Sequence, residues 1–519
     1  MIVHDPVDVC VVGLGAAGGT IASGAAAAGR SVVGLEAGPR EDPVRSFDAD
    51  EVAHAVDRRL LWSDPEVMVL DDQPPQVGPW LARNRGVGGP FAWSGFAYRM
   101  LPSDLESWPI GYEDLEPWYE RAEELLQVRG LAGEHPYDAP RRGPYPLPPL
   151  PRVPGTERLA EAARSLGWHP YHPPAAVGPS CDRCGLCTFY GCHTGAKGGT
   201  LAHLDRPGLE VRAGATAVEV VDTAGAPRRA VRYLDERGEA HEQPARVVVL
   251  ALNAPYVTRL MLLSGLGLDN DQLGRHLTFH TGTMAWGVFD EVLDVDRAPA
   301  QQVGVADLSE ARPAAAGAPF RRGGLLHAGM PAAFTGGPLA FARALDTTVP
   351  LPEGVPRYGD GLLRFAAHAY RRHQAVYVLG EDLPQPENRV ELDPEVTDRH
   401  GLPAVRYVYR PHPEDLAQQD HLREAARRLL EKAGATQVAA LPPSPVPGGI
   451  FAGHAHGTTR MGHDESTSVA DDVGLVHGTD DVFVAGAGLF VTASAVNPLL
   501  TIVALALRAV PAIVDASGR

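Results

Sequence analysis

Residues 7–18 read VDVCVVGLGAAG, a mostly apolar run that leads directly into three glycines. Continuous apolar residues bounded by a Gly-rich turn are typical of a buried parallel strand. The spacing of Gly13, Gly15 and Gly18 lets the chain turn tightly, approach a pyrophosphate with its backbone and pack a helix closely on the strand. An Ala-rich segment to about residue 28 predicts that helix, whose N-terminus would attract phosphate groups.

A second strand, over residues 31–35, completes a βαβ unit and ends at Glu36. This acid follows the glycines by about 20 residues, where a carboxylate would bind ribose hydroxyls. Because the glycines follow one predicted strand, open a predicted helix and have this acid, the segment predicts a dinucleotide-binding fold. The pattern alone does not separate FAD from NAD.

The 519 residues carry 46 Lys and Arg against 64 Asp and Glu, which gives a formal net charge of −18. A chain this acidic disfavours nucleic acid and anionic membranes as partners. The N-terminal residues show no export signal, and the apolar run over 498–514 is shorter than the ~20 residues of a membrane span. We therefore expect a cytoplasmic protein with a buried C-terminal helix.

The rest of the chain mixes helical and strand patterns. Helical spacing of apolar residues predicts helices over 112–127 and 421–433, and apolar runs predict strands between 209 and 255 and between 374 and 409. Residues 295–345 are rich in Ala, Pro and Gly with weak periodicity, and they are interpreted as loops that could cover a site.

Further motifs, in order along the chain, resemble the glucose-methanol-choline (GMC) oxidoreductases, flavoenzymes that oxidise alcohols. They are RGVGG at 85–89, WPI at 108–110, GAK at 195–197, PENRV at 386–390, HAHGTTRMG at 454–462 and AVNP at 495–498. The resemblance spans nearly the whole chain and looks closest to the pyranose oxidase, glycoside 3-oxidase and sugar dehydrogenase branch. It implies an α/β fold: a Rossmann-like FAD-binding domain of the GMC and p-hydroxybenzoate hydroxylase type, with a second, α+β substrate domain built on an antiparallel sheet.

The resemblance also implies domain bounds and cofactor contacts. The FAD-binding domain would comprise residues 1–280 and 450–519, with a Pro-rich excursion near 136–190, and residues 281–449 would form the substrate-binding domain. Residues expected to bind FAD are Gly13, Gly15, Gly18, Glu36, Gly88, Gly89, Trp93, Val218, Gly486, Ala487 and Pro498. Some pyranose oxidases attach FAD through a His before a Trp, but Ala92 stands there in this chain, so we expect non-covalent FAD.

Two catalytic positions follow from the same resemblance. In pyranose oxidase-like members, a His six residues before the Arg of the Arg-Met-Gly triplet and an Asn before Pro serve the active site, and these positions fall on His454 and Asn497. A neutral imidazole suits removal of a hydroxyl proton near pH 7 while hydride passes to flavin N5. Asn497 would hold the hydroxyl in place. Whether His456 takes part directly or only supports the active site stays open. His276 and His280 are assigned no chemical role.

The implied reaction is oxidation of a secondary hydroxyl of a pyranose sugar or glycoside, at C2 or C3, to a ketosugar. Electrons would pass to O2 or a quinone-type acceptor, and the oligomeric state stays open. The presence of both His454 and Asn497 counts against a flavoprotein retained only for binding.

A run of four cysteines, Cys181, Cys184, Cys187 and Cys192, carries an alternative. Its spacing approaches that of iron–sulfur ligands and could also hold zinc. The alternative function is a sugar or aminosugar dehydrogenase that relays electrons through a cluster to a partner. A similar segment is common in the family without metal, so we predict no metal here.

Overall fold

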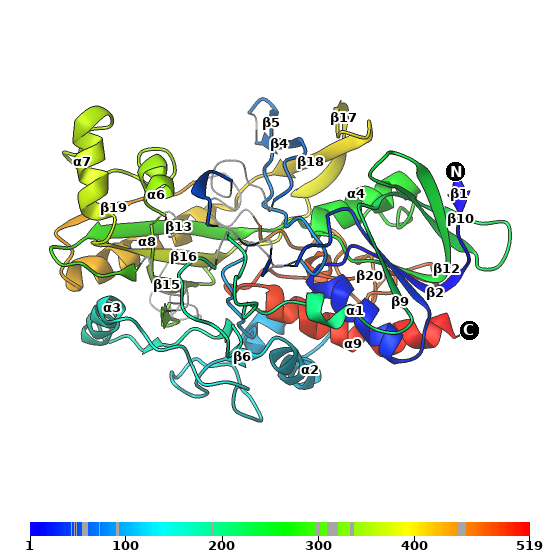
Figure 1. Ribbon diagram of the computed structural model, residues 1–519, viewed down its shortest axis with the longest axis horizontal. Helices are drawn as coiled ribbons and strands as arrows, with labels where there is room; N and C mark the ends of the chain where they lie inside the picture. The colour runs from blue at the N-terminus through cyan, green and yellow to red at the C-terminus, as the bar shows by residue number, and fades with distance from the viewer. Residues whose placement is uncertain are drawn as a thin grey trace.

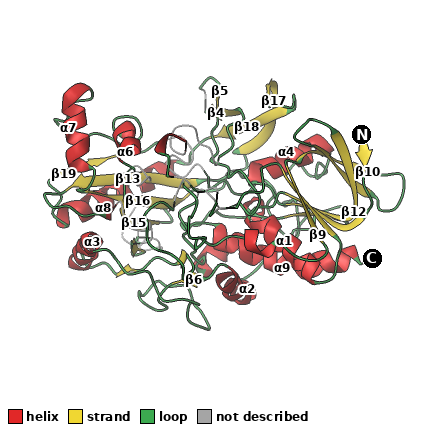
Figure 2. Cartoon of the chain, viewed as in Figure 1, coloured by secondary structure: helices red, strands yellow, loops and turns green. Residues whose placement is uncertain are grey.

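The computed structural model describes residues 1–42, 44–45, 47, 49–53, 61–71, 73–89, 93–187, 190–295, 302–308, 320–332, 337–444 and 453–518. Two large sheets lie toward opposite ends of an elongated molecule, and both chain termini lie at the end that holds the eight-stranded sheet (Figure 1). Helices lie beside both sheets (Figure 2).

The eight-stranded sheet contains the βαβ unit predicted from residues 7–36. Its order is β10 (Thr216–Asp222), β11 (Arg229–Leu234), β12 (Ala240–Leu250), β2 (Val7–Val12), β3 (Val32–Glu36) and β9 (Leu209–Ala213), while β1 (Ile2–Val3) and β20 (Val482–Val484) also pair with β12. Strands β12, β2, β3 and β9 run parallel to one another, whereas β10, β11 and β12 form an antiparallel meander. The expected Rossmann-like sheet is confirmed.

Three helices pack at this end of the molecule: α1 (Ala16–Ala27), α2 (Tyr112–Leu125) and α9 (Leu499–Ser517). Helix α9 has 19 residues and a mean hydropathy of 2.0, so length and composition alone would allow it to cross a membrane. Its buried residues, which include Leu500, Val503 and Ala506, pack into the cores shared with α1 and α2. The apolar C-terminal segment therefore forms a helix that packs in the protein core, as the sequence predicts.

The six-stranded sheet is antiparallel throughout, which confirms the sheet expected for the second domain. Its order is β19 (Gln437–Ala440), β13 (His280–Val288), β16 (His373–Glu381), β15 (Gly324–Met330), β14 (Val303–Val305) and β7 (Pro170–Tyr171). Helices α3 (Pro154–Ser165) and α8 (Pro413–Lys432) share a core with one face. Helices α6 (Pro338–Ala344) and α7 (Gly359–Ala369) share a core with the other.

A smaller sheet joins distant parts of the chain. Strands β17 (Arg389–Thr397) and β18 (Pro403–Tyr409) pair with β4 (Glu66–Leu70) and β5 (Gln76–Gly78) through the parallel β18–β4 contact. The remaining elements are helix α4 (Ala254–Ser264), the strand pair β6 (Val128–Arg129) and β8 (Ala175–Ala176), and short 3-10 turns at Pro102–Leu105, Leu201–His203 and Ala487–Leu489.

Two sequence predictions need correction. The stretch 295–345 is not uniformly loop, because β15 and α6 lie within it; β15 is buried on both faces, so its sequence lacks the alternation that marks a half-exposed strand. Residues 296–301, 309–319 and 333–336 of that stretch lie outside the described residues. Helix α8 begins at Pro413 rather than at residue 421, because its first turns are polar and are defined by a Pro and the His412 cap.

Candidate active site

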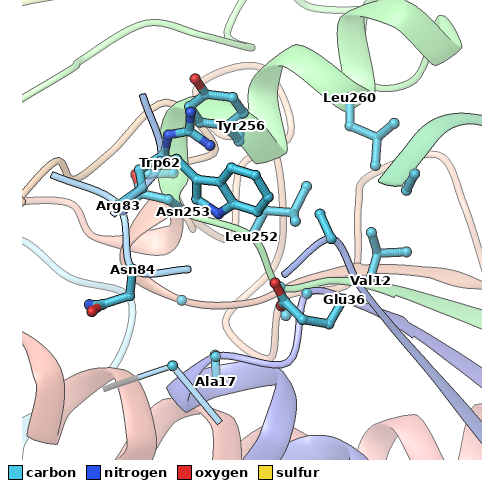
Figure 3. Close-up of a pocket in the computed structure, with 18 of the residues that line it drawn as sticks. Val12, Ala17, Glu36, Trp62, Arg83, Asn84, Leu252, Asn253, Tyr256 and Leu260 are labelled. Carbon is cyan, nitrogen blue, oxygen red and sulfur yellow. The ribbon is translucent and has the colours of Figure 1, made fainter. Parts of the chain in front are cut away.

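A cavity of about 300 Å³ opens at the carboxyl ends of β2, β3 and β12 (Figure 3). Val12, Glu36 and Leu252 line it from these three strands or the residues that follow them. This edge of a parallel sheet is where open α/β folds bind their ligands. We call this space the first cavity.

The glycine loop leaves room for a ligand on one side and none on the other. A Cβ added at Gly18 would lie 1.8 Å from the carbonyl oxygen of Gly13, so Gly18 allows helix α1 to pack on β2. A Cβ added at Gly15 would meet nothing within 4 Å, and Gly15 precedes helix α1 without any side-chain cap. An open backbone beside an uncapped helix N-terminus fits a phosphate group.

Glu36 has its carboxylate fixed by the backbone. Its Oε2 accepts a hydrogen bond from the Leu14 N–H at 3.0 Å, and its Oε1 accepts one from the Gly38 N–H at 2.8 Å. Burial raises the pKa of Glu36, and the two N–H donors oppose that shift. Because a carboxylate can accept about four hydrogen bonds, both oxygens retain capacity for the hydroxyls of a ribose.

The predicted cofactor residues divide into two groups in the structure. Those that line the first cavity are Gly13, Gly15, Glu36, Gly89, Trp93, Gly486 and Ala487. Outside the lining are Gly18, Gly88, Val218 and Pro498. Each of these four lies beside a lining residue or serves packing: a Cβ at Gly88 would lie 2.6 Å from Leu201 Cβ, Val218 occupies a β-bulge after Ala217, and Pro498 precedes Leu499. Ala92, on which non-covalent attachment rests, lies outside the described residues.

The opposite wall of the first cavity is built from residues that no sequence motif predicts. Trp62, Arg83 and Tyr256 gather there (Figure 3). The Arg83 guanidinium lies 3.7 Å over the Tyr256 ring and pairs with Asp64 at 3.1 Å. These residues come from the segment before β4, the segment after β5 and helix α4, and no local motif joins them.

His454 lies next to Gly453, which lines the first cavity, and it contacts a second histidine. The Nδ1 atoms of His454 and His280 are 2.9 Å apart, and His280 Nε2 lies 3.2 Å from the carbonyl oxygen of Ala493. Burial lowers the pKa of His454 to about 4 and holds the pKa of His280 well below its usual range. Both imidazoles are therefore neutral at pH 7.

The contacts of His280 fix the tautomer of His454. A carbonyl oxygen only accepts hydrogen bonds, so the Nε2–H of His280 is the donor to Ala493. In a neutral ring the other nitrogen then carries the lone pair, so His280 Nδ1 accepts the hydrogen bond from His454 Nδ1–H. The lone pair of His454 consequently lies on Nε2. His280 had no predicted role, because nothing along the chain indicates that β13 brings it to His454.

Two more histidines surround this pair. The ring of His456 stacks on Phe490 with centroids 5.3 Å apart, and its centroid lies 4.8 Å from that of His280. His327, on β15, has its centroid 4.3 Å from that of Phe96 in an edge contact. Burial holds the pKa of His456 well below its usual range and lowers that of His327 to about 3. The surroundings of His454 in this cluster are therefore uncharged.

Asn497 lies at the end of a loop that is clamped from the N-terminal half of the chain. The Thr492 hydroxyl donates to the Asp104 carbonyl oxygen at 3.0 Å, and the Ser494 hydroxyl donates to the Asp104 carboxylate at 2.9 Å. The side-chain oxygen of Asn497 is buried and has no hydrogen-bond partner among the described residues. The described contacts link His454 to this loop through His280 and Ala493 rather than through Asn497 itself.

A second, smaller cavity adjoins the same loop. Val496, directly before Asn497, lines it together with Tyr98 and Leu325. Leu499, two residues after Asn497, lines the first cavity. In sequence Asn497 lies between these two lining residues, and neither it nor His454 lines either cavity.

The four cysteines of the run lie near enough to interact electrostatically, but they do not form a group of ligand atoms within 4.8 Å of one another among the described residues. Cys184 instead groups with Asp182 and His193, whose ligand atoms all lie within 4.8 Å of one another. His193 Nε2 is 2.7 Å from the Asp182 carboxylate, and all four cysteines are unbridged. The spacing of the cysteines predicts neither Asp182 nor His193 as a neighbour of Cys184.

Comparison with known proteins places the chain among flavoenzymes. Models of the GMC oxidoreductase family match residues 98–282 and 384–506. A 6'''-hydroxyparomomycin C oxidase from Streptomyces lividus is 31% identical, over 96% of this chain and 90% of its own. A C-glycoside 3-oxidase from Arthrobacter globiformis is 34% identical, over 54% of this chain and 48% of its own. A formate oxidase from Aspergillus oryzae has the same fold, with a TM-score of 0.71 at 16% identity over 98% of each chain.

Proposed function

Because the chain belongs to the GMC oxidoreductase family, which acts on CH–OH groups with FAD, we propose that it oxidises a secondary hydroxyl of a pyranose sugar or glycoside to a ketone. The observation that carries the proposal is the contact of His454 Nδ1 with His280 Nδ1 at 2.9 Å, which orients a buried, neutral imidazole next to Gly453 of the first cavity. The relatives named for glycoside and paromomycin oxidation support a carbohydrate substrate.

The first cavity would hold FAD. Its pyrophosphate fits the open backbone at Gly15 and the N-terminus of helix α1, and a ribose fits the carboxylate of Glu36. We propose that attachment is non-covalent and that O2 or a quinone-type molecule is the final acceptor. When bound, FAD supplies the acceptor for the hydride that leaves the substrate carbon.

His454 acts as the general base in this mechanism. Its Nε2 takes the hydroxyl proton as the hydride departs, so that the carbon–oxygen bond becomes a carbonyl. A pKa of about 4 keeps His454 unprotonated throughout the neutral range. The proton taken up stays on Nε2, while the Nδ1–Nδ1 contact of 2.9 Å with His280 on the other side keeps the ring from rotating.

Asn497 positions the substrate. The amide N–H of Asn497 can donate to the oxygen of the reacting hydroxyl, and its buried side-chain oxygen, which lacks a protein partner among the described residues, can accept from a neighbouring donor of the substrate. The clamp of Thr492 and Ser494 on Asp104 holds the loop on which this amide lies. A fixed hydroxyl lowers the entropic part of the barrier to transfer.

The second candidate function is a sugar or aminosugar dehydrogenase with an iron–sulfur relay at Cys181–Cys192. The observation that bears on it is the grouping of Cys184 with Asp182 and His193, because iron–sulfur clusters prefer several thiolates around one site. That mixed ligand set favours the plain flavoenzyme.

The test is anaerobic titration of the purified, FAD-loaded protein with a panel of sugars and glycosides while the flavin spectrum is followed. Bleaching by a pyranose, with the product identified as a ketosugar, is the expected result. Bleaching only by primary or non-carbohydrate alcohols would overturn the proposal. Admission of air afterwards distinguishes O2 from an obligatory quinone acceptor.

A further inference from the structure

The second cavity is next to the proposed catalytic groups but belongs to a different part of the chain. Ser494 and Val496, from the loop that ends at Asn497, line one side of it. Tyr98 lines the side nearest the histidine cluster, with its ring centroid 5.5 Å from that of His327. The opposite wall comes from residues 131–145 of the Pro-rich excursion. A substrate that reacts at His454 can therefore place a neighbouring group in this cavity.

Aromatic rings dominate the lining of the second cavity. They are the rings of Tyr98, His135, Tyr137, Tyr145, Tyr171 and His172. Tyr171 and His135 stack with centroids 4.0 Å apart, and Tyr145 already carries the Arg141 guanidinium 3.6 Å above its ring. Aromatic faces attract cations, and the contact with Arg141 shows that one ring of this wall does so.

Two of the charged side chains that line the cavity are neutralised within the protein. The Asp104 carboxylate pairs with Arg322 at 3.2 Å. The Arg99 guanidinium pairs with Glu123 at 2.8 Å and with Glu116 at 3.3 Å. These pairs hold the wall together, and both side chains already have a partner of opposite charge within the protein.

Asp138 differs from these charged residues. One of its oxygens accepts a hydrogen bond from the Gly133 N–H at 2.8 Å, which closes the loop 133–138. No basic side chain in the described part of the chain lies within ion-pair distance of its carboxylate. A half-buried carboxylate beside several tyrosine rings has the chemistry of a site for an organic ammonium group.

From this arrangement we propose that the second cavity binds an ammonium group of the substrate, with Asp138 as its counter-ion. Amino-substituted glycosides are then preferred over neutral ones. The inference rests on the proposed oxidation of glycosides and adds the substrate class within it. The acidic chain, with a net charge of −18, would also attract such cations from solution.

The experiment compares two glycosides that differ by one amino group in place of one hydroxyl. The rate of anaerobic flavin reduction is measured with each, for the wild type and for Asp138→Asn, which retains an oxygen for the Gly133 N–H. The wild type should prefer the amino compound by about 10-fold in kcat/KM, and Asp138→Asn should lose that preference through KM while its rate with the neutral compound stays unchanged. Asp269→Asn, which removes an exposed acid outside both cavities, should keep it.

Salt gives a second readout. Raising the ionic strength should weaken the preference in the wild type and in Asp269→Asn and leave Asp138→Asn unaffected, because an ammonium–carboxylate contact at a cavity open to solvent is screened. Equal loss with both glycosides in Asp138→Asn would assign the residue to loop structure and overturn the inference. A preference of the wild type for the neutral glycoside would also overturn the inference. Failure of the proposed function is distinct, since neither glycoside would then reduce the flavin.

Discussion

The two ends of the reaction site are built in opposite ways. The side of the first cavity proposed for the pyrophosphate and ribose depends on backbone from one short segment, residues 7–36, where glycines leave open space and N–H groups hold the carboxylate of Glu36. The proposed catalytic end depends on side chains from β13, β15 and two C-terminal loops, all brought together by the tertiary fold. A cofactor site built from backbone tolerates changes of most side chains. The proposed catalytic end depends on one atom, the Nε2 of His454.

The largest effect should follow from removing that atom. His454→Ala deletes the base, so the rate constant for flavin reduction by the best sugar should fall about 10³-fold, within the range for loss of a general base. Stopped-flow absorbance under anaerobic conditions measures it. His463→Ala removes an exposed histidine of the same segment and should reduce the flavin at the wild-type rate. Equal rates for the two variants would remove His454 from the mechanism.

The backbone character of the first cavity is tested with a pair of glycines. Gly15→Val should fold but bind FAD about 100-fold more weakly, because its side chain fills the space proposed for the pyrophosphate and costs charge-assisted hydrogen bonds. Gly18→Val should fail to fold, because its Cβ would lie 1.8 Å from the Gly13 oxygen. Flavin content and thermal melting of the two proteins separate these outcomes. A Gly15→Val protein with full flavin would place the pyrophosphate elsewhere.

This contrast also explains how much the sequence could predict. Residues 7–36 predict their own structure because the strand, the glycine turn, the helix and the acid that define the unit follow one another in sequence, and the expected α/β fold with an antiparallel second sheet is confirmed. His454 and Asn497 could be named through family motifs, and their catalytic roles stay predictions. His280 and His327 could not be named in this way. Sheet pairing places β13 and β15 at the site, and the chain between them and His454, about 170 residues or fewer, carries no local pattern that encodes the contact.

A medium effect is expected at His280, which positions His454. His280→Ala removes the acceptor for His454 Nδ1–H, so the ring can rotate or change tautomer, and flavin reduction should slow by about 10- to 100-fold. Because the pKa of His454 is about 4, protonation removes its lone pair only at low pH, and the wild-type rate should be constant above about pH 5 and fall through pH 4.

The pH profile distinguishes positioning from a general structural defect. In His280→Ala, water that enters the vacated space should restore part of the hydration of His454 and raise its pKa toward the usual 6.5, so the rate should begin to fall at a higher pH than in the wild type. A slower variant with an unshifted profile would mean that His280 contributes packing alone.

The smallest effect is expected at the cysteine run, which borders the first cavity without lining it. Lys197 Nζ donates to the Cys187 carbonyl oxygen at 2.6 Å and to that of Trp93 at 3.3 Å, so the segment meets the cavity wall through backbone oxygens rather than through thiols. Cys184→Ser should therefore change flavin reduction less than about two-fold, since a partly exposed thiol outside the reacting groups contributes little.

Iron, zinc and acid-labile sulfide are measured on the same samples, with Cys10→Ser, a change in the buried strand β2, as the control for thiol loss. Stoichiometric iron and sulfide in the wild type, lost in Cys184→Ser together with slower transfer to a quinone, would establish the electron relay. Because flavin reduction precedes that transfer, its rate would still be preserved. The two half-reactions, measured separately, thus decide whether the backbone-built cofactor end passes electrons directly to an acceptor or through the cysteines.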